Sequence, residues 1–427
     1  MLERIADRSA RIVVVGQGYV GLVVAMRASE AGFEVVGLEV DEGRAASLAD
    51  GRSYIEDVPD EVLRAALDRG YRPTSDPADL EGFDVAVISV PTPLQEGLPD
   101  LTFIEEAATT LAPHVRDGTL TILESTTYPG TTEELVGPIL EAGSGLVAGR
   151  DFLLGYSPER IDPGNPTFGL HNTPKVVAGI DEASADAVEA FFGAFVEHTV
   201  RVSGCGEAEL AKIIENTFRH VNIALVNELA MFAHDLAIDV NEAIDAASTK
   251  PFGFMPFRPG PGVGGHCLPV DPSYLSWKVR TQLGESFRFI ELANDINDHM
   301  PHYVVRRVTA ALNRHRKAVN GSSLLVLGAS YKPNVGDTRE SPVEAIVEQL
   351  RGLGAEVVVV DPHVGAAHYA GAPLVAEAGA AELEGADLVL LLTDHDAFDY
   401  AAIGTHARLL LDTRNRIRDA TAELERL

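Results

Sequence analysis

The sequence predicts an α/β protein in which two doubly wound domains are joined by a region of long helices. Short runs of Val, Ile and Leu alternate with helical stretches in residues 1–203 and again in residues 317–427. This alternation is typical of parallel sheets with crossover helices. Residues 204–316 instead carry long apolar periodicity of the helical kind. We expect three domains with these boundaries, because 427 residues exceed what one core accommodates.

The composition argues against several classes of partner. A formal net charge of −30 opposes binding to nucleic acid or to an anionic membrane surface, although clustered basic residues can still bind a small anion. The two cysteines, Cys205 and Cys267, cannot form a disulfide framework, which indicates a reducing compartment. The N-terminus lacks a signal-peptide pattern, and no apolar run reaches the ~18 residues of a spanning helix. We therefore expect a soluble, cytoplasmic protein.

The first domain opens with a dinucleotide fingerprint. Residues 11–15 form a β-branched run, and residues 16–21 read GQGYVG, the G-x-G-x-x-G pattern between a strand and a helix. Gly16 permits the tight turn and Gly18 lets the backbone approach a pyrophosphate at the helix N-terminus. Gly21 permits close packing of the helix on the strand. The pattern predicts a Rossmann-like domain, with Tyr19 and Val20 as further cofactor contacts.

An acid on the second predicted strand indicates the type of cofactor. Residues 34–40 form a predicted strand whose end carries Glu39, about 20 residues beyond the glycines, where an acid holds the ribose hydroxyls. A 2′-phosphate would be repelled there, so NAD is favoured over NADP. Arg44 either stacks or pairs at the adenine side, or is a solvated helix charge.

Two further predicted strands end in threonine-containing turns. Residues 84–90 are followed by Pro91 and Thr92, and residues 119–124 are followed by a turn that contains Thr127. Ligands bind at the carboxyl ends of parallel strands, so these residues are cofactor or substrate candidates; otherwise they are ordinary turn hydroxyls. The sequence TTEE at 131–134 predicts a capping box for the next helix.

The segment SPERIDPGN, residues 157–165, forms a rigid polar loop after a predicted strand at 152–156. Its neighbouring acid and base, Glu159 and Arg160, suggest a site rather than a surface turn. A strand at 175–180, a helix at 183–195 and a strand at 199–202 are expected to complete the first domain.

The central region contains two long helical stretches, residues 208–236 and 287–316. Apolar faces on such helices need cover, which favours a dimer spine. Lys212 and Asn216 are four residues apart and share one helix face, either as a functional pair or as ordinary helix residues.

Between these helices lies FMPFRPGPGVGGHCLPVD, residues 254–271, whose prolines and glycines predict an irregular loop. Gly264 and Gly265 permit close approach to Cys267, with His266 and Asp271 nearby in the sequence. Such a thiol is either a nucleophile or a buried small apolar residue.

The last domain repeats the strand–helix alternation, with strands expected at 323–327, 356–360, 387–392 and 408–412. Lys332, Arg339 and Arg414 fall near the carboxyl ends of these strands. Together they would make a suitable cradle for a diphosphate.

Seven motifs together resemble the UDP-glucose/GDP-mannose (nucleotide-sugar) 6-dehydrogenase family along nearly the whole chain. They are GQGYVG (16–21), SVPTP (89–93), ESTTYPGTTEE (124–134), SPERIDPGN (157–165), AKIIENTFRHVNIALVNELA (211–230), PGPGVGGHCLPVDP (259–272) and GASYKPNVGDTRESP (328–342). The resemblance implies an NAD-binding Rossmann domain, a central dimerisation segment and a C-terminal domain that holds a UDP-sugar.

The resemblance also implies a chemistry, in which C6 of a hexose is oxidised twice with NAD⁺. Cys267 would bind the aldehyde as a thiohemiacetal, and the thioester formed from it would be hydrolysed to the uronate. Lys212 and Asn216 match the family's oxyanion-stabilising pair, and Asp271 matches the acid that orients the lysine or water. Glu159 and Thr127 match residues near the hydrolytic water.

Other residues match the family's ligand cleft. Arg339 is expected near the cofactor. Glu159, Lys212 and Asn216 are also expected to contact the substrate, and the further expected substrate contacts are Arg160, Lys250, Arg258, Gly264, Lys332 and Arg414. Lys250 is expected to reach the substrate from the partner subunit. No metal site is expected.

Within the family, SPERIDPGN and FMPF-x-PGPGVGGHC resemble the branch that acts on UDP-N-acetylhexosamines. UDP-N-acetylglucosamine is the first expectation, then UDP-N-acetylmannosamine. Val23-Val24 replace the Pro-Leu that relatives often carry, and Arg258 stands where an aromatic residue is expected. The alternatives are a UDP-glucose 6-dehydrogenase and a non-catalytic sugar-nucleotide sensor.

Overall fold

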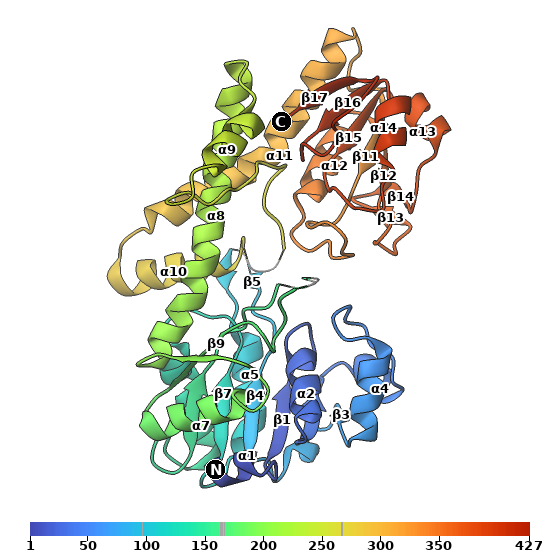
Figure 1. The fold of residues 1–427 in the computed structure, drawn as a ribbon. Helices are drawn as coiled ribbons and strands as arrows, with labels where there is room; N and C mark the ends of the chain where they lie inside the picture. Colours follow the sequence, from blue (N-terminus) through green and yellow to red (C-terminus); the bar gives the residue numbers. More distant parts are fainter. Residues whose placement is uncertain (96, 163–164, 166, 266–267) are drawn as a thin grey trace. The chain divides into compact units, whose positions relative to one another are not determined.

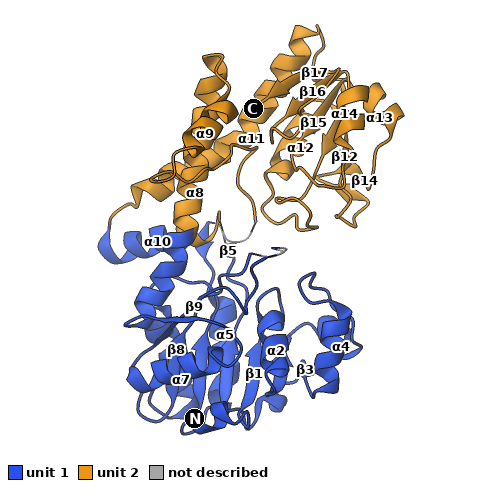
Figure 2. Cartoon of the chain, in the orientation of Figure 1, with its two compact units in different colours: residues 1–215, 273–284 blue, residues 216–272, 285–427 orange. Residues whose placement is uncertain are grey.

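The computed structural model describes residues 1–95, 97–162, 165, 167–265 and 268–427. The chain divides into two compact units, shown in Figure 2: unit 1 comprises residues 1–215 and 273–284, and unit 2 comprises residues 216–272 and 285–427. The division falls inside the long helix α8 (Cys205–Asp235). The three-domain boundaries expected from the sequence remain a prediction.

Unit 1 is built on an eight-stranded sheet with the order β10-β9-β8-β7-β4-β1-β2-β3. The six neighbouring strands β3-β2-β1-β4-β7-β8 follow the doubly wound order. Among the described strands of this sheet, only the β8–β9 pair is antiparallel. The strands are β1 (Arg11–Val15), β2 (Glu34–Leu38), β3 (Arg72–Thr74), β4 (Val85–Ile88), β7 (Leu120–Leu123), β8 (Leu153–Tyr156), β9 (Lys175–Gly179) and β10 (Thr199–Arg201), with a separate hairpin of β5 (Leu94–Gln95) and β6 (Leu98–Pro99).

Helices cover both faces of this sheet, as Figure 1 shows. Alternate residues of β1 serve the two faces: Ile12 and Val14 pack in one core with Leu22, and Val13 and Val15 pack in the other. The helices are α1 (Leu2–Ala6), α2 (Gly21–Glu30), α3 (Glu42–Ala49), α4 (Asp60–Asp68), η1 (Pro77–Leu80), α5 (Thr102–Leu111), η2 (Ala112–His114), η3 (Thr132–Val136), α6 (Gly137–Ser144) and α7 (Glu182–Phe192).

Unit 2 contains a seven-stranded sheet with the order β13-β14-β12-β11-β15-β16-β17. Its strands from β14 to β17 repeat the doubly wound order of unit 1, all parallel. The strands are β11 (Ser323–Leu327), β12 (Glu356–Val360), β13 (His368–Tyr369), β14 (Ala372–Val375), β15 (Leu388–Leu391), β16 (Leu409–Asp412) and β17 (Glu423–Arg426). The expected α/β class with two Rossmann-like sheets is therefore confirmed.

One face of the second sheet is covered by a long helix. In α11 (Arg288–Arg314), Met300, Val304, Val308 and Leu312 pack in one core with β11, β12, β15 and β16. Helix α12 (Pro342–Gly352) shares this core, and α13 (Ala380–Gly385) and α14 (Tyr400–His406) contribute to the core on the other face. None of the helices in the described part of the chain combines the length and apolar character that crossing a bilayer demands.

The two expected central helices are present as α8 and α11, with α9 (Val240–Ser248) and α10 (Asp271–Leu283) between them. The described residues of 254–270 form neither helix nor strand, as their prolines and glycines predict. Gly262 and Gly265 have φ values of +139° and +84°, which favour glycine.

Candidate functional site

The glycine turn after β1 has the geometry of a nucleotide cradle. Gly16 has φ +89°, and a Cβ on it would lie 2.3 Å from the Ser89 carbonyl oxygen. A Cβ on Gly21 would lie 1.9 Å from the Gly16 oxygen, whereas one on Gly18 would meet nothing within 4 Å. Helix α2 begins without a capping side chain or an acid in its first turn. The open side at Gly18 and this uncapped helix start fit a pyrophosphate.

Glu39 follows β2 and is buried beside the glycine turn. Its carboxylate accepts the backbone N–H groups of Gln17 at 3.3 Å and Asp41 at 3.1 Å. Tyr54 donates its hydroxyl to the Gln17 carbonyl at 2.8 Å, and Arg44 lies 5.4 Å from the Tyr54 ring centroid. Burial and the Glu39 charge raise the pKa of Tyr54. The glycines and this acid fit an NAD molecule, and the contact of Glu39 with its ribose remains a prediction.

Other predicted cofactor residues lie near the carboxyl ends of β1, β4 and β7 in unit 1. Thr92 is buried, while Tyr19 and Pro91 are exposed. The Ser125 hydroxyl accepts the Val90 N–H at 2.9 Å and donates to its carbonyl at 2.8 Å, which joins the segments after β4 and β7. Val20 directly precedes α2.

The expected capping box at 131–134 is wrong. Thr131 makes no capping bond; its hydroxyl donates to the Tyr128 carbonyl at 2.8 Å and lies 2.6 Å from the buried Thr127 hydroxyl. The N–H groups of Gly130 and Thr132 instead bond to Glu209 of α8, at 2.6 and 2.9 Å. A carboxylate from a distant segment therefore takes the place of the local cap.

Glu159, predicted as the loop acid, is buried and bonded through both carboxylate oxygens. Its Oε1 accepts the N–H groups of Arg160 at 2.6 Å and Ile161 at 2.5 Å, and its Oε2 lies 3.0 Å from the Lys175 ammonium. Lys175 also contacts Glu124 at 2.5 Å. Burial raises the pKa of Glu159, but the Lys175 and Lys212 charges and these hydrogen bonds outweigh it and lower that pKa.

Arg160, expected to contact substrate, anchors its own loop. Its guanidinium pairs with Glu215 of α8 at 2.6 Å and donates to the Pro174 carbonyl at 2.6 Å. This arrangement ties the loop containing Glu159 to the helix that carries Lys212.

Lys212 and Asn216 lie one turn apart on α8, and both side chains are buried. Asn216 donates to the Asp271 carboxylate at 2.5 Å, so these two predicted residues meet in unit 2. Lys212 belongs to unit 1, where its charge acts on Glu159.

Cys267 and His266 lie outside the described residues. The adjoining loop packs tightly in unit 2: a Cβ on Gly264 would lie 2.7 Å from the Glu340 carbonyl oxygen and 2.7 Å from Tyr331. Gly265 donates its N–H to the Arg339 carbonyl at 3.1 Å. The structure thus brings the loop with Gly264 against the segment that carries Lys332 and Arg339.

Side chains that the sequence did not single out support the loop. Asn227 of α8 accepts the Gly260 N–H at 2.9 Å and donates to Asn297 of α11 at 3.0 Å. Arg414 donates to the Leu392 carbonyl at 2.6 Å, and a Cβ on Gly260 would lie 2.6 Å from its guanidinium. Burial lowers the pKa of Arg414.

The remaining predicted cations differ in their surroundings. Arg339 makes a two-pronged ion pair with Asp337, at 3.0 and 2.7 Å, and is exposed. Lys332 is half-buried in the turn after β11, where its carbonyl accepts the Ser330 hydroxyl at 2.9 Å. Exposed Arg258 pairs with Asp245, and Lys250 lies 4.9 Å from the Phe252 ring centroid.

The turn that carries Lys332 is held by a buried His395. Its Nδ1 accepts the Asn334 N–H at 2.9 Å and its Nε2 lies 3.0 Å from Asp361. Asp361 also accepts the N–H groups of Ala329 and Ser330 at 2.7 and 3.1 Å. Burial raises the pKa of Asp361, but these bonds outweigh it and lower the pKa to about 2.

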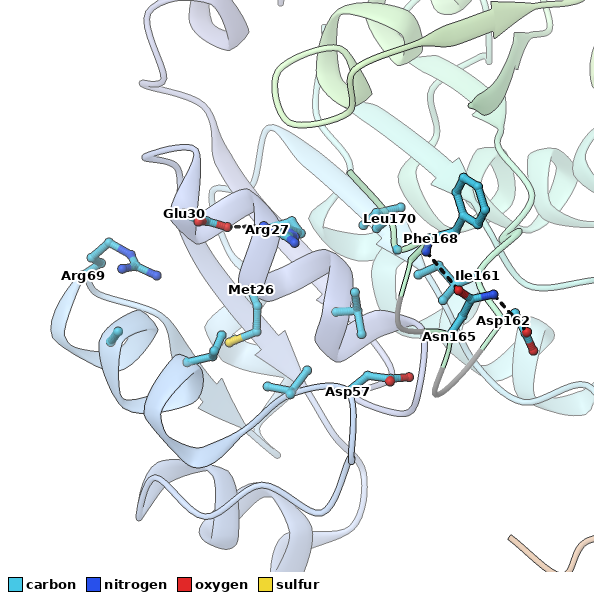
Figure 3. A pocket seen from close by; sticks show the side chains of 15 residues that line it. Met26, Arg27, Glu30, Asp57, Arg69, Ile161, Asp162, Asn165, Phe168 and Leu170 are labelled. Atoms are coloured by element: carbon cyan, nitrogen blue, oxygen red, sulfur yellow. Dashed lines mark hydrogen bonds and ion pairs between the residues drawn. The ribbon is translucent and has the colours of Figure 1, made fainter. Parts of the chain in front are cut away.

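A cavity of about 400 Å³ lies in unit 1 between α2, α4 and the segment around residues 161–170 (Figure 3). Met26 and Arg27 of α2 and Ile161 and Leu170 are among the residues lining it. Among the described residues of its lining, none is a predicted cofactor contact.

Comparison with known proteins gives matches over three consecutive segments of the chain. The UDP-glucose/GDP-mannose dehydrogenase family matches through its NAD binding domain at residues 10–196, its central domain at 206–299 and its UDP binding domain at 325–419.

Individual proteins also match over most of the chain. The UDP-N-acetyl-D-mannosamine dehydrogenase of Pyrococcus horikoshii is 36% identical over 96% of each chain. The UDP-N-acetyl-D-glucosamine 6-dehydrogenase of Pseudomonas aeruginosa is 38% identical over 84% of each chain. The solved structure of the UDP-D-ManNAc dehydrogenase from Pyrococcus horikoshii superposes with a TM-score of 0.89 at 34% identity, covering 97% of this chain and 98% of that one.

Proposed function

Since the chain belongs to the UDP-glucose/GDP-mannose dehydrogenase family, we propose that it oxidises C6 of a UDP-N-acetylhexosamine to the uronic acid. It is an NAD-dependent nucleotide-sugar dehydrogenase, and its N-terminal segment is an NAD binding domain. UDP-N-acetylglucosamine is the proposed first substrate, followed by UDP-N-acetylmannosamine.

One observation carries the choice of sugar: two relatives that match at 36% and 38% identity are named for UDP-N-acetylhexosamines. A 2-acetamido group carries a hydrogen-bond donor and an acceptor that a hydroxyl cannot replace. A site built for it would lose about 1–3 kcal/mol for each buried polar group left unpaired by UDP-glucose. At least a tenfold preference would follow at ~1.4 kcal/mol per decade.

In the proposed chemistry, bound NAD⁺ supplies the hydride acceptor for each of the two oxidations. The Cys267 thiolate adds to the C6 aldehyde, and the thioester formed after the second oxidation is hydrolysed to the uronate. The covalent bond retains the aldehyde and makes it able to donate a second hydride.

The residues around this chemistry would stabilise and orient it. Lys212 and Asn216 would stabilise the oxyanion, and the 2.5 Å bond to Asp271 would fix the Asn216 amide for that task. The ionised carboxylate of Glu159 and the hydroxyl of Thr127 would hold the hydrolytic water.

The proposed nucleotide contacts are in unit 2. The cationic contacts with the sugar nucleotide are Lys332, Arg414 and Arg258, with Gly264 providing close approach, and Arg339 is proposed near the cofactor. We assign these roles within the expected domains 1–203, 204–316 and 317–427. Arg160 and Lys250 remain proposed substrate contacts, the latter across a dimer.

A homodimer is proposed from an apolar stripe on α8. Phe218, Leu225, Leu229 and Phe232 are exposed at helical spacing along one helix. Leu229→Asp should lower the mass measured by light scattering from dimer to monomer. A dimer that survives this change, or a monomeric wild type, would contradict the proposal.

The direct test of the function measures NADH production with UDP-N-acetylglucosamine, UDP-N-acetylmannosamine, UDP-N-acetylgalactosamine and UDP-glucose in parallel. We expect an N-acetylated sugar to give the highest kcat/KM. UDP-glucose as the best substrate would favour the alternative 6-dehydrogenase, and binding without NADH production would favour the sensor.

A further inference from the structure

We propose that Lys175 is a positioning residue that fixes the Glu159 carboxylate for thioester hydrolysis. This inference rests on the proposed function, which places Glu159 beside the hydrolytic water. Lys175 was not among the residues predicted from sequence. Its role follows from contacts that all lie inside unit 1.

Lys175 is the first residue of β9 and is 1% exposed. Its ammonium lies 2.5 Å from Glu124 Oε1, 3.0 Å from Glu159 Oε2 and 4.9 Å from the Phe192 ring centroid. Glu124 directly follows β7, so its position is set by the sheet. Lys175 therefore connects the Glu159 carboxylate to Glu124, which is held at the end of β7.

Lys175 determines the orientation of one particular oxygen of Glu159. Oε1 already accepts two N–H groups, from Arg160 and Ile161, and a carboxylate oxygen has about two lone-pair positions. Among the described residues, Oε2 accepts the Lys175 ammonium and the Glu124 carboxyl interacts with the same carboxylate, so Oε2 rather than Oε1 has a lone-pair position left for a water. Without Lys175, rotation of the carboxylate would no longer be opposed at Oε2.

The charges favour keeping Glu159 ionised. Two buried carboxylates share one ammonium, and burial together with the Glu159 charge raises the pKa of Glu124. Burial also acts on Glu159, but Lys175 and Lys212 lower its pKa. The first proton taken up by this group therefore goes to Glu124. Glu124 Oε2 has no hydrogen-bond partner among the described residues, so a proton there displaces no bond.

The hydrolysis step uses an ionised, oriented Glu159 as follows. The water oxygen bonds to the thioester carbon as one water proton passes to Oε2, and the C–S bond breaks with its electron pair going to the Cys267 sulfur. The uronic acid leaves, and Glu159 returns the proton to solvent. No further oxidant or reductant is needed in this step.

The test is a double-mutant cycle of Lys175→Met and Glu159→Gln in the full chain. We expect Lys175→Met to lower kcat by about tenfold or more and to lower KM with it, because the hydrolytic step slows and the acylated enzyme accumulates. A burst of NADH should precede slow turnover, and intact mass spectrometry should detect the acylated enzyme. Lys175→Arg should recover part of the rate because it keeps the positive charge.

If Lys175 acts through Glu159, the double variant should be no slower than Glu159→Gln alone. Lys317→Met removes a lysine that pairs with Asp387, and it should leave kcat unchanged. The proposal would be overturned if the loss of kcat in the double variant equalled the product of the two single losses, or if Glu159→Gln kept the wild-type rate.

If Lys175→Met does not fold, as judged by thermal unfolding, Glu124→Gln takes its place in the cycle. Glu124→Gln removes the charge that holds Lys175 and keeps the side-chain shape. The double variant of Glu124→Gln and Glu159→Gln should therefore also be no slower than Glu159→Gln alone. The cycle is run with whichever sugar nucleotide the wild type oxidises best. A preference for UDP-glucose would therefore contradict the proposed substrate without deciding the role of Lys175.

Discussion

Asn216 donates a 2.5 Å hydrogen bond to Asp271, and both side chains are buried in unit 2. Asn216 is on α8 and Asp271 begins α10, so the bond joins two helices that are 55 residues apart in sequence at these positions. A charged acceptor strengthens such a bond and fixes the amide orientation. The proposed oxyanion donor is therefore oriented by Asp271, the acid that the family resemblance had assigned to the lysine or the water.

Replacing Asn216 by Ala should lower kcat about 100-fold, the usual loss when one oxyanion donor is removed. Steady-state NADH production checks this. Asn222→Ala is the matched control on α8, because within the described part of the chain its amide bonds only to the Phe218 carbonyl. An Asn216→Ala enzyme with wild-type kcat would remove Asn216 from the proposed machinery.

Glu39 should set the preference for NAD. Replacing it with Ser should lower kcat/KM for NAD roughly 10- to 100-fold, since hydrogen bonds from ribose hydroxyls to a charged acceptor are lost. NADP should be used poorly by the wild type and relatively better by the variant. Glu34→Ser, at the opposite end of β2, should change neither value. A wild type that prefers NADP would contradict the assignment.

Cys267→Ser should release little uronate, and no thioester should appear in the intact mass, because serine cannot form that intermediate. Cys205→Ser should remain active, since Cys205 is buried and burial raises the pKa of its thiol. The reverse pattern, an active Cys267→Ser and an inactive Cys205→Ser, would show that the nucleophile is misassigned.

Glu209 should make stability depend on pH. Burial raises its pKa from 4.5 to about 7, against hydrogen bonds from Thr132 and Gly130 that lower it. Between these pH values the folded protein holds a proton that the unfolded chain releases. The contribution of the Glu209 carboxyl group to the free energy of unfolding is thus present at low pH and falls by about 1–3 kcal/mol as pH rises from 4.5 to 7.

The melting temperature of Glu209→Gln, measured at pH 5, 6 and 7, should approach or exceed that of the wild type as pH rises. Exposed Glu207→Gln, two residues earlier, should show a constant difference from the wild type. A constant difference for Glu209→Gln as well would mean that its carboxyl is ionised throughout this range.

Local patterns predicted where the glycine turn and its neighbouring acid lie. Gly16, Gly18 and Gly21 lie at the turn after β1 and Glu39 directly follows β2, while their contacts with the cofactor remain predictions. The family resemblance similarly identified Asn216 and Asp271 as candidate catalytic residues. Cys267 lies outside the described residues, so its role remains a prediction.

Contacts between distant segments could not be predicted. Glu209 caps a helix 77 residues earlier in the chain, which displaced the expected local capping box. Lys175 meets Glu124 across 51 residues. The sequence did contain a clue: Lys175 begins the apolar strand β9, and Glu124 directly follows the apolar strand β7. Charged side chains at such buried positions indicate an ion pair, because they stay buried only when paired.

The acid that follows β12, Asp361, is filled by hydrogen bonds from its own unit. Asp361 accepts five hydrogen bonds, from Ala329, Ser330, His363, Val364 and His395, which exceeds the roughly four lone-pair positions of a carboxylate. Glu39, at the matching place in unit 1, has capacity to spare. Saturation with internal donors leaves the Asp361 carboxylate no position for a ligand hydroxyl, so this acid cannot act toward a ribose in the way proposed for Glu39.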